Sequence, residues 1–78
     1  MPQFFFNIQD TDELTRDEEG SDLADLDAVR KEATDSARQI MSQAILEGQP
    51  ANGRKFVITN EEGIVVLEFP FKEAIRPG

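Results

Sequence analysis

The carboxylates of this sequence are the side chains whose number and spacing could do chemistry. Nine of the 16 Asp and Glu residues fall between residues 10 and 27 against one arginine, so this stretch holds the whole formal net charge of −8. Clustered carboxylate oxygens are ligands for hard cations such as calcium. A calcium loop of the EF-hand type needs glycine at its sixth position, and counting from Asp10 or Asp17 places Thr15 or Asp22 there. We therefore expect no metal site.

The acidic segment has two other interpretations. In the first, the acids from Asp22 to Asp27 lie at the start of a helix, where negative charge is favourable, and the others keep a small protein soluble. In the second, the segment docks on a basic protein partner, including by mimicry of nucleic acid. The candidate docking residues are Asp10, Asp12, Glu13, Asp17, Glu18 and Glu19.

Residue types that the sequence lacks exclude several classes of function. The chain has no Cys and no His, which excludes disulfides, thiolate nucleophiles and the usual zinc ligand sets. Its serines have no histidine to activate them, and its glycines do not form a phosphate-binding loop. We expect a non-enzymatic protein with no catalytic residue and no cofactor.

Charge and hydropathy also limit the partners and the location of the chain. In the C-terminal third, four glutamates balance the basic residues Arg54, Lys55, Lys72 and Arg76, so we expect no basic face for nucleic acid. No stretch approaches the ~20 apolar residues of a membrane span, and the apolar run at 4–6 is shorter than the ~7–15 residues of a secretory signal. These features predict a soluble cytoplasmic protein that binds neither nucleic acid nor membrane.

The hydrophobic pattern predicts one small domain over residues 1–78. The predicted elements are a strand at 2–9, an acidic loop at 10–24, a helix at 25–47, a β-hairpin of strands 54–60 and 64–69, and a tail at 70–78 with one short helical turn. Alternating aromatic residues indicate the first strand, and apolar residues at steps of three and four indicate the helix, with Asp25 as its N-cap. We expect the loop to be ordered, with a short strand near Leu14.

The hairpin register decides which side chains share a face. The turn at Asn60 to Gly63 predicts that Thr59 pairs with Ile64 and that Phe56 pairs with Leu67. This register places Phe56, Ile58, Val65, Leu67 and Phe69 on one face, and Val57, Thr59, Ile64 and Val66 on the other.

Together the elements predict an α+β fold. We expect a three-stranded, mainly antiparallel sheet with one long helix packed on one face, in the order β-α-β-β. Strand 64–69 is apolar on both sides, so we place it at the centre and the other two strands at the edges. One helix covers one face only. The candidate interface residues on the uncovered face are Phe5, Val57, Ile64 and Val66.

An exposed cluster of aromatic and branched side chains usually marks a protein interface. We therefore expect the uncovered face to bind a second copy of the chain, as a homodimer, or another protein. Two alternatives remain open: the tail covers this face through Phe71 and Ile75, or the hairpin has a different register.

Several stretches resemble a known family. They are Phe4–Ile8, Asp17–Gly20, Asp25–Ala33, Gly53–Phe56, Gly63–Leu67 and Pro70 with Phe71. Through them the chain resembles, nearly end to end, a family of short uncharacterised alphaproteobacterial proteins that is grouped only as a domain of unknown function. The resemblance implies a bacterial cytoplasmic domain and brings with it no activity, cofactor or catalytic residue.

The sequence thus predicts a non-enzymatic interaction module that self-associates or docks through the uncovered sheet face. The alternative is an acidic regulator or inhibitor whose 10–27 segment binds a basic protein. We expect Val66→Glu to disrupt the first and spare the second, and added salt to weaken only the second. A third class, a subunit that completes another chain's active site, stays open.

Overall fold

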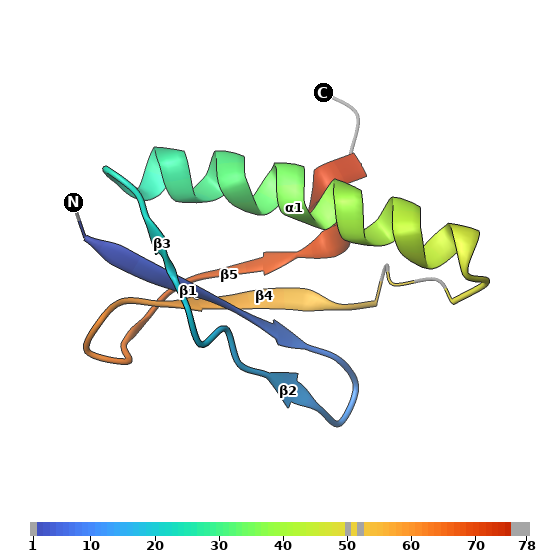
Figure 1. The fold of residues 1–78 in the computed structure, drawn as a ribbon, viewed down its shortest axis with the longest axis horizontal. Helices are drawn as coiled ribbons and strands as arrows, with labels where there is room; N and C mark the ends of the chain where they lie inside the picture. Colours follow the sequence, from blue (N-terminus) through green and yellow to red (C-terminus); the bar gives the residue numbers. More distant parts are fainter. Residues whose placement is uncertain (1, 50, 52, 76–78) are drawn as a thin grey trace.

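One long helix covers one face of an antiparallel sheet in the computed structural model, which describes residues 2–49, 51 and 53–75 (Figure 1). The elements in chain order are β1 (Gln3–Gln9), β2 (Leu14–Thr15), β3 (Ser21–Asp22), α1 (Leu26–Leu46), β4 (Lys55–Thr59), β5 (Val65–Pro70) and the 3-10 helix η1 (Phe71–Ile75). The predicted α+β fold is confirmed, and the short strands β2 and β3 raise the strand count from three to five.

β4 lies inside the sheet, in the order β2-β1-β4-β5, and β3 also pairs with β1. β1 therefore has β4 along one edge and the two short strands along the other. The prediction that strand 64–69 is central is wrong, because β5 pairs with β4 alone and its outer edge meets no other described strand.

The β4–β5 register differs from the predicted one. Phe56 pairs with Phe69 and Thr59 pairs with Val65, with a β-bulge between these pairs. The turn is longer than predicted, because the side-chain oxygen of Asn60 accepts hydrogen bonds from the backbone N–H groups of Glu62 (2.9 Å) and Ile64 (3.0 Å). Ile64 is thus part of the turn, which shifts the register by one residue, and the bulge shifts it by one more.

The predicted helix is present as α1. The Asp25 carboxylate accepts a hydrogen bond from the backbone N–H of Ala28 (2.9 Å), which confirms Asp25 as the N-cap. Gly48 follows the helix with a φ of 73°, a backbone conformation that favours glycine. The side chains that α1 buries are Val29, Ala33, Ala37, Met41 and Ala44. Because three of these are alanines, the helix backbone can approach the sheet closely.

The tail packs with the helix. The Arg38 guanidinium in α1 donates a hydrogen bond to the backbone oxygen of Ala74 (2.7 Å). Phe71 is fully buried, and its ring centre lies 4.8 Å from that of Phe56 in the core. The alternative in which the tail covers the other sheet face is therefore wrong for the described residues, since η1 lies on the same side as α1 (Figure 1). The part of the tail at 76–78 lies outside the described residues.

Candidate functional site

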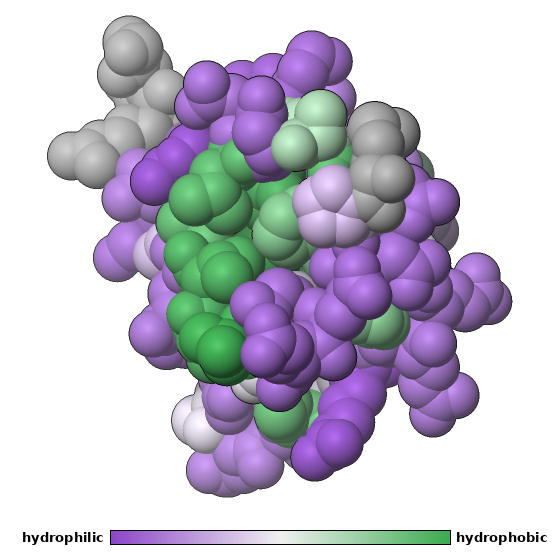
Figure 2. Space-filling view, turned by 90° about the vertical axis from the view of Figure 1, so that its left-hand side faces the viewer, coloured by the Kyte–Doolittle hydropathy of each residue, from purple (hydrophilic) through white to green (hydrophobic). Residues whose placement is uncertain are grey.

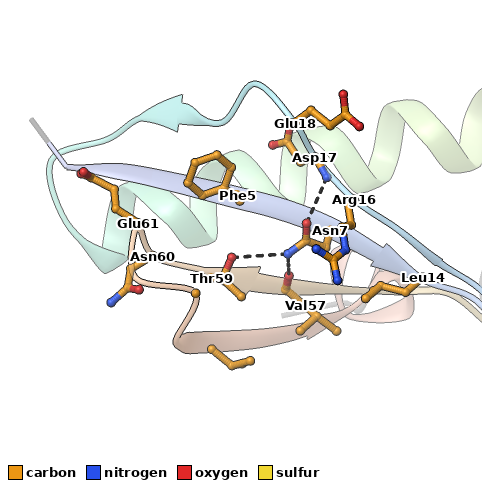
Figure 3. A pocket seen from close by; sticks show the side chains of 12 residues that line it. Phe5, Asn7, Leu14, Arg16, Asp17, Glu18, Val57, Thr59, Asn60 and Glu61 are labelled. Carbon is orange, nitrogen blue, oxygen red and sulfur yellow. Dashed lines mark hydrogen bonds between the residues drawn. The ribbon is translucent and has the colours of Figure 1, made fainter.

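The sheet face opposite α1 carries a shallow hollow that is open to solvent, which we call the outer groove (Figure 3). Its volume is about 640 Å³. The floor consists of Phe5, Asn7, Leu14, Val57, Thr59 and Val65, which come from β1, β2, β4 and β5. Val65 is 50% exposed and Leu14 is 47% exposed, so apolar surface faces solvent on this side of the sheet.

Two loops form the rims of the outer groove. Arg16, Asp17 and Glu18, from the loop between β2 and β3, line one side. The turn between β4 and β5 lines another part and contributes Glu61. Three carboxylates and one guanidinium therefore surround a floor of four apolar and two polar side chains, so the rim carries a net negative charge.

Asp17 holds the first rim against β1. One of its carboxylate oxygens accepts a hydrogen bond from the backbone N–H of Phe6 (3.0 Å), and the other accepts from those of Glu19 and Gly20 (3.2 Å each). Phe6 lies between the parts of β1 that pair with β2 and β3, so the carboxylate serves there in place of a strand partner. This residue, predicted as a docking residue, therefore has a structural role in the loop. The signal for that role is the Asp17-x-x-Gly20 spacing, which is typical of a turn.

Asn7 connects the rim to the floor. Its side-chain oxygen accepts a hydrogen bond from the backbone N–H of Asp17 (3.0 Å). Its side-chain nitrogen donates to the backbone oxygen of Val57 (2.9 Å) and to the Thr59 hydroxyl (3.4 Å), as Figure 3 shows. One side chain thus joins β1, β4 and the rim loop, which fixes the shape of the outer groove before any partner binds.

Gly20 brings the loop backbone against the aromatic ring on the floor. It has a φ of 74°, and a Cβ placed on it would lie 2.9 Å from a ring carbon of Phe5. The loop therefore covers part of Phe5, which explains why this outward-facing phenylalanine is partly buried. The sequence pattern alone leaves Phe5 as an unexplained apolar residue on a polar face.

Two of the four predicted interface residues line the outer groove, namely Phe5 and Val57. Val66 does not, because the bulge turns it toward the helix side, where it packs against the core. Ile64 is 56% exposed but lies in the turn and is not part of the groove lining. The groove is lined instead by Leu14, predicted in the loop, and by Val65, predicted on the opposite face of the hairpin.

The acidic segment does not form a single surface. Asp10, at the end of β1, forms an ion pair with Arg54 (3.1 Å). Its pKa is lowered, chiefly by the hydrogen bond from the Thr11 backbone N–H; desolvation opposes this, and the hydrogen bond and charge of Arg54 lower the pKa further. Of the six predicted docking residues, only Asp17 and Glu18 line the outer groove. No group of three or more acidic side chains in the described ranges is arranged to hold a metal ion.

A second hollow lies at the end of the molecule, between the start of α1 and the β4–β5 turn. Its volume is about 660 Å³, and Phe4, Leu26 and Val66 form its apolar part. Figure 2 looks at this end and shows a patch of apolar surface surrounded by hydrophilic surface. We call it the end hollow.

Comparison with known proteins assigns the chain to a family. The profile of the family described as Domain of unknown function (DUF6894) matches residues 3–72. The chain belongs to this family. The match runs from the start of β1 into η1, so the family region includes every residue of the outer groove. No curated protein and no solved structure matches the chain. Within the part of the chain that the structure describes, no helix is long and apolar enough to cross a membrane.

Proposed function

We propose that this protein is a non-enzymatic interaction module that binds another protein through the outer groove. The observation that carries the proposal is the absence of a second layer: α1 and η1 both lie on one side of the sheet, and no described helix or strand covers the other. Apolar side chains on that open face are therefore available to a partner. An apolar centre with a polar rim is the usual composition of a protein interface.

The outer groove combines two hypotheses from the sequence, docking through the sheet face and binding of a basic protein by the acidic segment. The sheet face supplies apolar contact area, and the acidic segment supplies Asp17 and Glu18 to its rim. In this proposal the module acts as an acidic regulator or inhibitor, because the same surface attracts a positively charged protein and then buries apolar area against it.

A non-enzymatic role fits the chemistry of the groove. It is shallow and open to solvent, whereas catalytic sites gain from excluding water. The chain supplies no His or Cys as a general base or a nucleophile. A bacterial cytoplasmic setting and a protein partner, with neither nucleic acid nor a membrane involved, belong to the same proposal.

The test compares the proteins that the full-length chain and two variants capture from a lysate. Val65→Glu places a charge on the groove floor at an edge strand, and Leu46→Glu places the same charge on α1, where Leu46 is 82% exposed. We expect the wild type and Leu46→Glu to recover the same partner and Val65→Glu to lose it by about tenfold or more. Equal recovery by all three proteins contradicts the proposal.

Self-association is the second form of the proposal, and light scattering measures it. A dimer that Val65→Glu converts to a monomer, and that Leu46→Glu leaves intact, would make a second copy the partner at this surface. A dimer that neither variant changes would place self-association elsewhere on the molecule.

A further inference from the structure

We infer that the partner segment in the outer groove is a basic amphipathic α-helix of another protein, an inference that rests on the proposed function. The outer groove lies on the face of the sheet, and its floor comes from four strands. An extended peptide adds to a sheet at an edge, through backbone hydrogen bonds, whereas an amphipathic helix lays its apolar side into a groove. A helix on this face would supply the layer that the chain itself lacks, opposite α1.

The width of the floor sets the length of this helix. From Leu14 in β2 to Val65 in β5 the floor crosses β1 and β4. Leu14 pairs with Gln9, whereas Val65 pairs with Thr59, which lies opposite Phe5, so the floor also runs four residues along the strands. Three inter-strand spacings (about 14 Å) and four residues along a strand (about 13 Å) give a diagonal of about 19 Å, which corresponds to about 13 residues of α-helix. Apolar residues at i, i+4, i+7 and i+11 of such a helix would contact Leu14, Val57 and Val65 or Phe5.

The charge of the rim sets the composition of the helix. Asp17, Glu18 and Glu61 line the groove, and the Glu18 side chain makes no hydrogen bond or ion pair within the described residues. Asp17 accepts backbone hydrogen bonds within the loop, and the Glu61 carboxylate accepts one from the backbone N–H of Gln3 (3.0 Å). Lysines or arginines beside the apolar stripe of a helix would therefore pair with Glu18 and be attracted by the charge of the other two. Arg16 is the one basic group of the lining and is likewise unpaired in the described part of the chain, so it favours a single acidic side chain at one position of the partner helix.

The same charges disfavour a second copy as the occupant. A symmetric dimer uses the same patch on both subunits. Two outer grooves facing each other would bring two acidic rims together, within molecules that each carry a net charge of −8. A basic partner removes this repulsion.

A model peptide tests the inference on the full-length protein. The probe is a dye-labelled peptide of leucine and lysine, about 14 residues long, with leucines at helical spacing. One control peptide has the same composition with leucine and lysine in strict alternation, and a second has glutamate in place of lysine. We expect fluorescence anisotropy to show binding of the probe at least about tenfold tighter than that of either control.

Two charge reversals locate the site. Glu18→Lys and Asp12→Lys change the net charge equally, and both residues are exposed in the acidic segment, but only Glu18 lines the outer groove. We expect Glu18→Lys to weaken binding of the probe about fivefold or more and Asp12→Lys to weaken it less than about twofold. Amide chemical shifts of Phe5, Val57 and Val65 should move on titration with the probe.

Three results would overturn the inference. They are equal binding of the probe and its controls, equal weakening by the two charge reversals, and shifts confined to the end hollow or to α1. If the probe fails in these ways while Val65→Glu still loses a captured partner, the proposed function stands and the partner class is wrong. If Val65→Glu also leaves capture unchanged, the proposed function fails as well.

Discussion

Asp17 shows how one carboxylate in an acidic stretch can have a structural role. Both of its oxygens accept backbone hydrogen bonds, and its own backbone N–H donates to Asn7. Glu18, next to it, is exposed and makes no such contact. The acids of this segment therefore differ in role from one residue to the next, and the groups available to a partner are the exposed ones.

Gly20 is the residue at which the loop depends most on having no side chain. Gly20→Ala should lower the free energy of unfolding by about 2–3 kcal/mol, because alanine is strained at this φ and its Cβ would overlap the Phe5 ring. Urea denaturation followed by circular dichroism measures the change. Gly63→Ala is the matched control: its φ is 81° with no atom within 4 Å of the added Cβ, so it should lose only about 1 kcal/mol.

The Phe5 contact can be separated from backbone strain. In a Phe5→Leu background, the smaller side chain leaves room for a Cβ at Gly20, so Gly20→Ala should lose less stability there than in the wild type. If Gly20→Ala lost the same free energy of unfolding in both backgrounds, the Phe5 ring would not be the cause of the loss.

Asp10 provides a pH-dependent contribution to stability. Its pKa in the folded state is below the ordinary value of 3.8, chiefly because the Thr11 backbone N–H donates to its carboxylate, and also because Arg54 is close. A lowered pKa means that this contribution is present above pH 3.8 and is lost as the pH falls through the folded-state value. A carbon-detected NMR titration of the Asp10 carboxyl should give a midpoint below 3.8. Arg54→Gln should return the midpoint only part of the way, and a full return would assign the shift to Arg54 alone.

At the scale of elements, the bulge in β5 decides which valine faces which side. Val66 packs against the core, whereas Val65 is half exposed in the outer groove. Val66→Glu should therefore lower the free energy of unfolding by about 2 kcal/mol, since it places a carboxylate against apolar side chains. Val65→Glu should change it by no more than about 0.5 kcal/mol. Urea denaturation measures both changes. If Val65→Glu lost more stability than Val66→Glu, the strand would have the register predicted from the sequence.

The position of Val66 changes how the Val66→Glu variant must be interpreted. Val66→Glu was expected to disrupt docking selectively, but in the structure it would disturb the core, so a loss of binding by that variant would be ambiguous. Val65→Glu is the variant that reports on the docking surface.

The elements themselves were largely predictable from local patterns. The three-to-four spacing of apolar residues gave the helix, and Asp25 marked its start. The hairpin register was not predictable, because it depends on a side chain, Asn60, that bonds two backbone N–H groups and lengthens the turn, and on the bulge that follows. The strand order depends on the pairing of β1 with β4, which are far apart in the sequence. Half of the predicted interface was misplaced because Ile64 joins the turn and the bulge turns Val66 toward the core.

The candidate site was predictable only in part for a second reason. Its floor includes Leu14, whose position depends on the pairing of β2 with the end of β1. Its rim depends on the hydrogen bonds of Asp17, which bring a loop onto the sheet edge. Contacts between segments about ten residues apart leave little trace in hydrophobic periodicity, so alternation within single strands could not reveal them.

At the scale of the whole molecule, apolar and acidic surface come together on one side. The segment that carries the net charge contributes Asp17 and Glu18 to one rim of the outer groove, while its other acids lie elsewhere. The layer of α1 and η1 occupies the opposite side of the sheet. In the proposed function, such an arrangement would attract a basic protein over a distance and then offer it a preformed floor.

The two edges of the sheet differ, and this difference limits aggregation. The outer edge of β1 is occupied by two very short strands and the Asp17 carboxylate, whereas that of β5 meets no described strand. A fibril needs two edge strands with unpaired backbone groups in each molecule, so that every copy can pair with a copy on each side. With one edge capped, we expect strand-to-strand joining to stop after a single event, which would limit growth into cross-β filaments.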